Sequence, residues 1–131
     1  MAFHGVKELV AEATSEIETI PIEGADTLIE NSEIILVDIR DVRELERDGT
    51  IPGSVHVPRG MLEFWVDPDS PYHKEVFASD KTFVFFCASA WRSALATKTV
   101  KDMGLKKVAQ LGGGFEAWKK QKYPIEKQQR K

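Results

Sequence analysis

The sequence predicts an α/β fold in which five parallel strands form a sheet with helices on both faces. Two unbroken apolar runs, residues 34–37 and 82–86, are typical of strands that are covered on both sides. Strand and helix patterns alternate along the chain, as they do around a parallel sheet. With 131 residues, the chain is about the size of one domain. We therefore expect a single domain over residues 1–131.

The first half of the chain opens on a helical pattern, in which Val6, Val10 and Ala13 recur at helical spacing. We expect this helix to form an N-terminal extension, residues 1–16, in front of the sheet. The next elements are a strand, a short helix, the first long strand, a charged helix and a brief strand, at residues 17–20, 25–29, 34–37, 41–47 and 53–58.

The second half begins with a long irregular connection, residues 59–80, in which Pro68 and Pro71 mark turns and residues 61–65 form a helical turn. Four regular elements follow, which are strand, helix, strand and helix at residues 82–86, 93–103, 108–111 and 115–122. The polar tail, residues 128–131, is expected to fray.

Composition excludes several classes of function. The net charge of −3 is too small to suggest a nucleic-acid partner. No apolar run reaches the roughly 20 residues of a membrane span, and the N-terminus lacks the basic start and apolar stretch of a signal peptide. The single cysteine cannot form an internal disulfide, which fits a reducing compartment. We expect a cytoplasmic protein.

That cysteine, Cys87, is the strongest functional candidate. It follows the apolar run 82–86 and precedes a helical pattern, so it lies where helix N–H groups favour an anion. A thiol in such a place ionises easily, and the thiolate is the nucleophile. The alternative is a small buried residue at a strand end, the commoner fate of a free cysteine. Chemistry in parallel sheets gathers at the carboxyl ends of strands, and Asp38 shares that position with Cys87.

The loop after Cys87 favours the functional interpretation. Its residues are mostly small, so the backbone can curl until several N–H groups point at one centre and bind an anion. Arg92 adds a positive charge near the rim. The candidate anion-binding residues are Ala88, Ser89, Ala90, Trp91 and Arg92.

Other motifs are weaker. The three histidines, His4, His56 and His73, have no metal-ligand spacing, and no second cysteine joins them, so we expect no metal site. The triplet at 112–114 is not a G-x-G-x-x-G fingerprint and is better explained as a structural turn. No cofactor is implied.

Three motifs in order resemble the rhodanese-like sulfurtransferases. They are Val-Asp-Ile-Arg at 37–40 together with the Gly-Thr-Ile-Pro-Gly segment at 49–58, the cysteine loop at 87–93, and Leu-Gly-Gly-Gly-Phe-Glu-Ala-Trp at 111–118. The resemblance covers most of residues 17–124. It implies a rhodanese-like fold with a five-stranded parallel sheet, and a cysteine that carries sulfur as a persulfide.

The resemblance also implies roles for further residues. Asp38 and Arg40 would brace loops beneath the site, as would Ser93, whose pairing with Arg92 matches the family's loop. Arg59 would line one wall of the pocket, in the segment 59–65. Two positions differ from the commonest loop: Ala88 replaces a basic residue and Ala90 replaces a glycine, which alone tolerates positive φ freely.

The sequence therefore predicts a sulfurtransferase that moves a sulfane sulfur through a Cys87 persulfide. The donor would be a small anion such as thiosulfate, and the acceptor a thiol, cyanide or a protein. One alternative is a non-catalytic interaction module of the same fold. The other is a phosphatase or arsenate reductase, but tyrosine-type phosphatases use C-x5-R, and Arg92 follows Cys87 by only five residues.

Overall fold

The structure is a computed structural model that describes residues 3–128. Residues 129–131, most of the expected polar tail, lie outside the described residues, as do residues 1 and 2. No helix among residues 3–128 is both long and apolar enough to cross a membrane.

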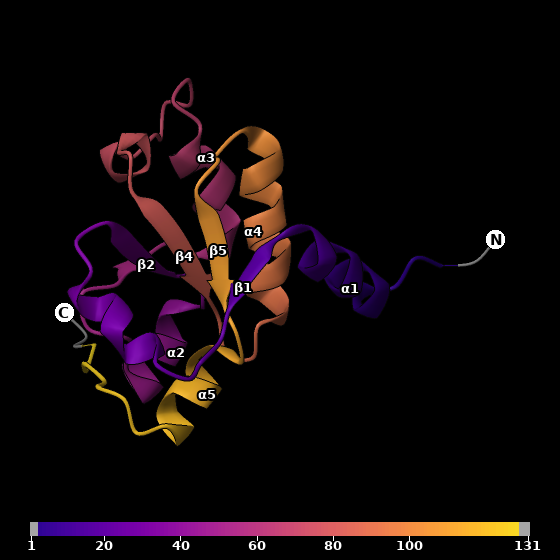
Figure 1. Cartoon of the computed structure of the whole chain (residues 1–131). Coiled ribbons are helices and arrows are strands. Elements are labelled where there is room, and N and C mark those ends of the chain that lie inside the picture. The colour runs from indigo at the N-terminus through magenta and orange to yellow at the C-terminus, as the bar shows by residue number, and fades with distance from the viewer. Residues whose placement is uncertain (1–2, 129–131) are drawn as a thin grey trace.

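Five strands form one sheet in the order β1-β5-β4-β2-β3, and all neighbouring strands are parallel. The predicted architecture, a five-stranded parallel sheet with helices, is thereby confirmed (Figure 1). The strands are β1 (Glu18–Ile20), β2 (Ile34–Asp38), β3 (Val55–His56), β4 (Thr82–Phe86) and β5 (Val108–Leu111).

Helices connect the strands. The α-helices are α1 (Val6–Glu16), α2 (Val42–Asp48), α3 (Leu62–Val66), α4 (Trp91–Met103) and α5 (Gly114–Lys120). Short 3-10 helices are η1 (Ala25–Glu30), η2 (Arg59–Met61) and η3 (Glu75–Ala78). The main difference from the sequence prediction is that α4 begins at Trp91 rather than at residue 93.

Alternating side chains of β4 fill both layers of the core. Phe83 and Phe85 pack with α3 and α4 on one face, and Cys87 continues that row. Val84 and Phe86 pack with η1 and α5 on the other face. A central strand with both faces buried needs apolar residues throughout, which explains the run at 82–86.

The N-terminal helix α1 lies outside these two layers and packs on α4. Val10 and Ala13 are its buried residues, and they meet Ala94. In Figure 1 the N-terminal end of α1 points away from the sheet. The helix therefore rests on α4 through its C-terminal half.

Candidate functional site

Cys87 lies just beyond β4, at the carboxyl edge of the sheet. Its neighbour there is Asp38, the last residue of β2, which pairs in register with Phe86. The sequence argument thus correctly placed both side chains at one edge. Cys87 is only 1% exposed, so its side chain is almost closed off from solvent.

Ser93 holds the sulfur of Cys87 from within α4. The backbone N–H of Ser93 donates to Cys87 Sγ at 3.3 Å. The thiol in turn donates to Ser93 Oγ at 3.5 Å. Ser93 is fully buried, and its hydroxyl donates to Gln110 Oε1 at 2.8 Å. One residue therefore touches the thiol through both its backbone and its side chain.

The loop turns into α4 at Ala90, which adopts a left-handed conformation with φ 76°. This is the position where the resemblance expects glycine. A side chain with a Cβ in this region stores roughly 1–2 kcal/mol of strain. The turn lets the helix start at Trp91, so Trp91 and Arg92 belong to the first turn of α4 rather than to the loop.

The N-terminus of α5 fixes the other side of the loop. The backbone N–H of Phe115 donates to the Cys87 carbonyl at 2.8 Å, and that of Glu116 donates to the Ala88 carbonyl at 3.0 Å. This approach requires Gly114, which has φ +63° and whose added Cβ would lie 2.6 Å from the Cys87 carbonyl oxygen. The glycine triplet is a turn, as predicted, and it also allows the N-terminus of α5 to pack against the thiol loop.

This contact gives the loop two different sides. The first two carbonyls are bound by α5, whereas no described residue accepts a hydrogen bond from the backbone N–H groups of Ala88 to Arg92. Unpaired N–H groups beside a helix N-terminus are suited to an anion. Ser89, in the middle of this segment, is exposed, and donor binding by the residues 88–92 stays a prediction.

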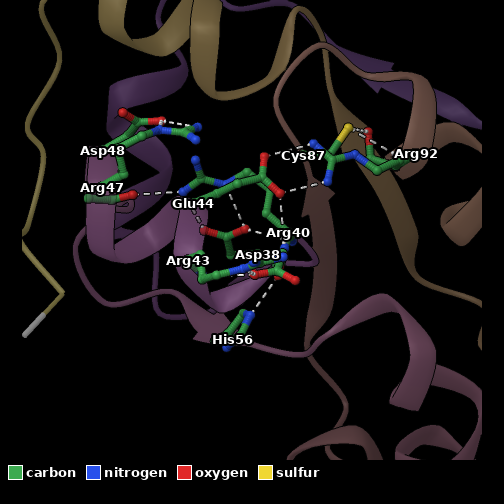
Figure 2. A network of polar contacts seen from close by, with 12 residues as sticks. Asp38, Arg40, Arg43, Glu44, Arg47, Asp48, His56, Cys87 and Arg92 are labelled. Carbon is green, nitrogen blue, oxygen red and sulfur yellow. Dashed lines mark hydrogen bonds and ion pairs between the residues drawn. The ribbon is translucent and has the colours of Figure 1, made fainter. Parts of the chain in front are cut away.

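Arg92 is not an unpaired positive charge. Its Nη1 and Nη2 donate to Glu44 Oε2 and Oε1 at 2.9 and 3.0 Å, and Figure 2 shows the guanidinium between Glu44 and Cys87. The hydrogen bond to Glu44, and to a lesser degree the nearby sulfur, raises the pKa of Arg92 above its ordinary value. The sequence around Arg92 gives no sign of this partner, which lies 48 residues away.

Glu44 is itself part of the start of α2. Its carboxylate accepts the backbone N–H of Asp41 at 3.1 Å, while Asp41 accepts from Arg43 N at 2.8 Å, which makes a capping box. The hydrogen bond from Arg92 lowers the pKa of Glu44, against the opposing effect of burial. Glu44 therefore links the start of α2 to the start of α4.

A buried ion pair lies beneath the site. Arg40 donates to Asp38 through Nε at 3.0 Å and Nη2 at 2.9 Å, and both side chains are almost fully buried. Thr50 Oγ1 donates to the same carboxylate at 2.7 Å. Arg40 also donates to the Gly49 carbonyl and stacks over Phe115 at 4.3 Å. This arrangement joins β2 to the segment after α2 and to α5, which fits the bracing role predicted for the pair.

Three further residues that the sequence singled out make no contact with the thiol among the hydrogen bonds and ion pairs of residues 3–128: His56, Arg59 and Trp91. His56 Nε2 hydrogen-bonds to the Arg40 carbonyl at 2.7 Å, which matches the packed role expected of it. Arg59, in η2 after β3, donates to Glu63 at 2.7 Å. Trp91 is 48% exposed at the first turn of α4. Within residues 3–128 the hydrogen-bond and ion-pair partner of the Arg59 side chain is Glu63, so its place in the pocket wall stays a prediction.

A separate pocket of about 500 Å³ lies at the opposite, amino end of the strands. It is lined by residues after α3, in η3 and at the end of α4, among them His73, Phe77 and Leu105. Neither Cys87 nor the loop that follows it lines this pocket. Within residues 3–128, no three His, Cys, Asp or Glu side chains gather in a way that could hold a metal ion.

Three residues that shape the site were missed from the sequence: Glu44, Gln110 and Gly114. A signal existed for two of them. Glu44 follows Asp41 by three residues, the spacing of a capping box. Gln110 is a lone polar residue in the apolar strand 108–111. The contact of Gly114 depends on how α5 meets a loop far away in sequence, and the pattern alone gives no hint of it.

Comparisons with known proteins identify the family of this chain. The model of the rhodanese-like domain matches residues 22–121. The chain is 33% identical over 110 residues to a Bacillus subtilis protein named "Putative sulfurtransferase YtwF", covering 83% of this chain and 97% of that one. It is 30% identical to the B. subtilis "Putative sulfur carrier protein YrkF", covering 82% of this chain but only 54% of that relative.

A solved structure from Rhodopseudomonas palustris is more similar still. It is 54% identical, covers 96% of this chain and 97% of its own, and superposes with a TM-score of 0.92. That protein is described as one of unknown function and as a "possible tyrosine phosphatase". The matched domain model spans most of the chain and includes Cys87, the loop that follows it and the glycine turn. The chain belongs to the rhodanese-like domain family.

Proposed function

We propose that this protein is a sulfurtransferase that carries a sulfane sulfur on Cys87. The observation that carries the proposal is the two-sided loop around the thiol. Its carbonyls are bound by α5, and its N–H groups are left to face an anion next to the only cysteine of the chain. Relatives named as sulfurtransferase and sulfur carrier support sulfur transfer at the level of the family.

The reaction has two steps. The Cys87 thiolate attacks the outer sulfur of a donor such as thiosulfate, the donor's S–S bond breaks, and sulfite leaves with the bonding pair. An acceptor nucleophile then attacks the terminal sulfur of Cys87–S–S⁻, and the Cys87 thiolate leaves. No external oxidant or reductant is needed, and the scheme is a ping-pong nucleophilic one. The loop N–H groups stabilise the terminal sulfur as an anion.

The acceptor comes from outside the chain. A second cysteine would allow an internal disulfide to release the sulfur, but Cys87 is the only one. A thiol, cyanide or a partner protein therefore removes it. A free nucleophilic thiol also fits a reducing compartment such as the cytoplasm.

Phosphatase activity is the second candidate, because the similar Rhodopseudomonas protein is described in those terms. The spacing argues against it. Arg92 follows Cys87 by five residues instead of the six of C-x5-R, and its guanidinium is held by Glu44. A phosphate with three oxygens needs a wider ring of donors than one sulfur does. A non-catalytic interaction module is the third, and the retained cysteine argues for activity instead.

Intact mass spectrometry tests the proposal. Incubation with thiosulfate should add the mass of one sulfur atom, and cyanide should remove it with release of thiocyanate. Cys87→Ser should show neither change. Parallel assays with an aryl phosphate should show no hydrolysis above that of Cys87→Ser. Hydrolysis that depends on Cys87, without any sulfur adduct from several donors, would instead assign a phosphatase.

A further inference from the structure

Gln110 is a buried amide that does not touch the thiol. It lies in β5, where it pairs in register with Thr19 of β1, and it is 2% exposed. A polar group at that depth is costly unless it is hydrogen-bonded. Both ends of the amide are bonded: Oε1 accepts from Ser93 Oγ at 2.8 Å, and Nε2 donates to Thr19 Oγ1 at 3.1 Å.

These bonds complete a chain that runs from the sulfur to the surface. The Cys87 thiol donates to Ser93 Oγ, Ser93 donates to Gln110, and Gln110 donates to the exposed Thr19. Each side-chain donor in this series thus points away from the sulfur, while the Ser93 N–H donates to it. A serine hydroxyl has a single proton, so Ser93 offers only a lone pair to sulfur while that proton is held by Gln110. This direction suits a thiol and opposes a sulfur anion.

The same side chains can form this series of hydrogen bonds with every donor and acceptor exchanged. The last torsion of glutamine is broad and roughly two-fold, so its amide can turn over. The separations of 2.8 and 3.1 Å suit either amide atom. After the turn, Thr19 O–H donates to Oε1, Nε2 donates to Ser93 Oγ, and the Ser93 hydroxyl donates to sulfur. No member of the chain loses its partner.

We propose that Gln110 is a positioning residue whose amide turns over when Cys87 loses its proton, and that it thereby aims the Ser93 hydroxyl at the sulfur anion. The thiol proton leaves to solvent, and the three polar side chains keep their own protons. Ser93 then donates twice to sulfur, through its hydroxyl and through its N–H at 3.3 Å. Sγ of a persulfide also carries no proton, so the same arrangement would serve sulfur transfer, and that part of the inference rests on the proposed function. The response of Gln110 to deprotonation of the thiol does not rest on the proposed function.

The first test follows the side-chain amide of Gln110 by NMR in the ¹⁵N-labelled full chain. Its NH₂ resonances should move with pH, with the same midpoint as the rate of Cys87 alkylation by iodoacetamide. They should stay still in Cys87→Ser. Gln121, at the end of α5, is the matched control and should not follow the thiol. Gln110 resonances that stay still while the thiol titrates would overturn the proposal, whether or not the protein transfers sulfur.

The second test uses a variant in which the direction of the hydrogen bonds cannot reverse. In Gln110→Glu the carboxylate only accepts, so it holds the Ser93 proton and prevents reversal. The midpoint of the alkylation profile should rise by about one pH unit or more. In a Ser93→Ala background the same substitution should have a clearly smaller effect. An equal rise in both backgrounds would overturn the proposal. If Gln110→Glu does not fold, the NMR titration decides alone, since it uses the unmodified chain.

Discussion

Glu44 holds Arg92 by two hydrogen bonds, at 2.9 and 3.0 Å, although 48 residues separate them in sequence. The pair joins the first turn of α2 to the first turn of α4, next to the buried thiol. The positive charge expected at the rim of the loop is therefore matched by a carboxylate. An anionic donor must compete with Glu44 for Arg92, or bind beside it through the loop N–H groups.

Glu44→Gln should improve the use of an anionic donor. The amide keeps an acceptor for the capping box but no longer neutralises Arg92, so the KM for thiosulfate should fall by about 2- to 10-fold. The gain should shrink at high salt, which screens the released charge. Glu46→Gln makes the same charge change on the same helix and should have little effect. Adding Arg92→Ala to Glu44→Gln should abolish the gain, and its persistence would contradict the proposed role of Arg92.

The same pair predicts a pH dependence of stability. Because Arg92 lowers the pKa of Glu44 below the ordinary value of 4.5, the folded protein binds this proton less readily than the unfolded chain does. The contribution of the Glu44–Arg92 pair to the free energy of unfolding is complete above pH 4.5. It is lost as the pH falls through the lower pKa that Glu44 has in the folded protein. Denaturant unfolding of the wild type and Glu44→Gln should therefore give a difference in unfolding free energy that shrinks on acidification. A difference that stays constant would show that the pair is not coupled to folding.

Ala90→Gly should stabilise the protein. Glycine relieves the strain of φ 76° but increases the entropy of the unfolded chain, which leaves a net gain of about 0.5–1 kcal/mol. The matched control is Ala88→Gly, two residues away with no positive φ, which should destabilise instead. Thermal unfolding of the two variants distinguishes these signs. Destabilisation by both would mean that Ala90 is not strained.

Gly114→Ala should be strongly destabilising. The new Cβ would meet both the Cys87 and the Ala88 carbonyls, at 2.6 and 2.7 Å, in a conformation that side chains rarely adopt. The expected cost is about 2 kcal/mol or more, with accelerated alkylation of Cys87 because the loop loses its seat on α5. Gly60→Ala is the control, since nothing lies within 4 Å of its added Cβ. Equal unfolding midpoints for the two variants would contradict the close contact.

Asp38→Asn should cost about 3–5 kcal/mol, because it leaves the guanidinium of Arg40 buried without its counter-charge. Urea unfolding measures the loss. The exposed Asp69, which has no ion pair among the described residues, provides the control Asp69→Asn, whose effect should be small. A loss in Asp38→Asn no larger than in the control would show that the buried pair is dispensable.

The sequence sufficed for the sheet and for the position of the thiol. Apolar runs reveal buried strands because every side chain of a central strand is covered, and the run at 82–86 ends directly at Cys87. The rule that reaction centres gather at the carboxyl ends of strands then brought Asp38 and Cys87 together. These inferences depend on local periodicity and on one topological rule.

The charge balance of the site could not be predicted in the same way. No acidic residue lies next to Arg92 in the sequence, and its partner Glu44 comes from α2 only after β2 and β4 pair. The pattern predicts the start of α4 at residue 93, whereas the helix begins at Trp91 after Ala90 adopts a left-handed conformation that alanine disfavours. In both cases a tertiary contact prevails over the local pattern.

The hydrogen bonds between α5 and the thiol loop also limit how the chemistry of this fold can change. The first two carbonyls after β4 are anchored to α5, and Ser93 is anchored to the sulfur, so both ends of the loop are fixed. A longer loop of the C-x5-R type would have to bulge outward between Ser89 and Trp91. These two fixed ends therefore set the length of the loop. A wider ring of N–H donors for an oxyanion can evolve only within those three residues, while the junction between loop and helix stays unchanged.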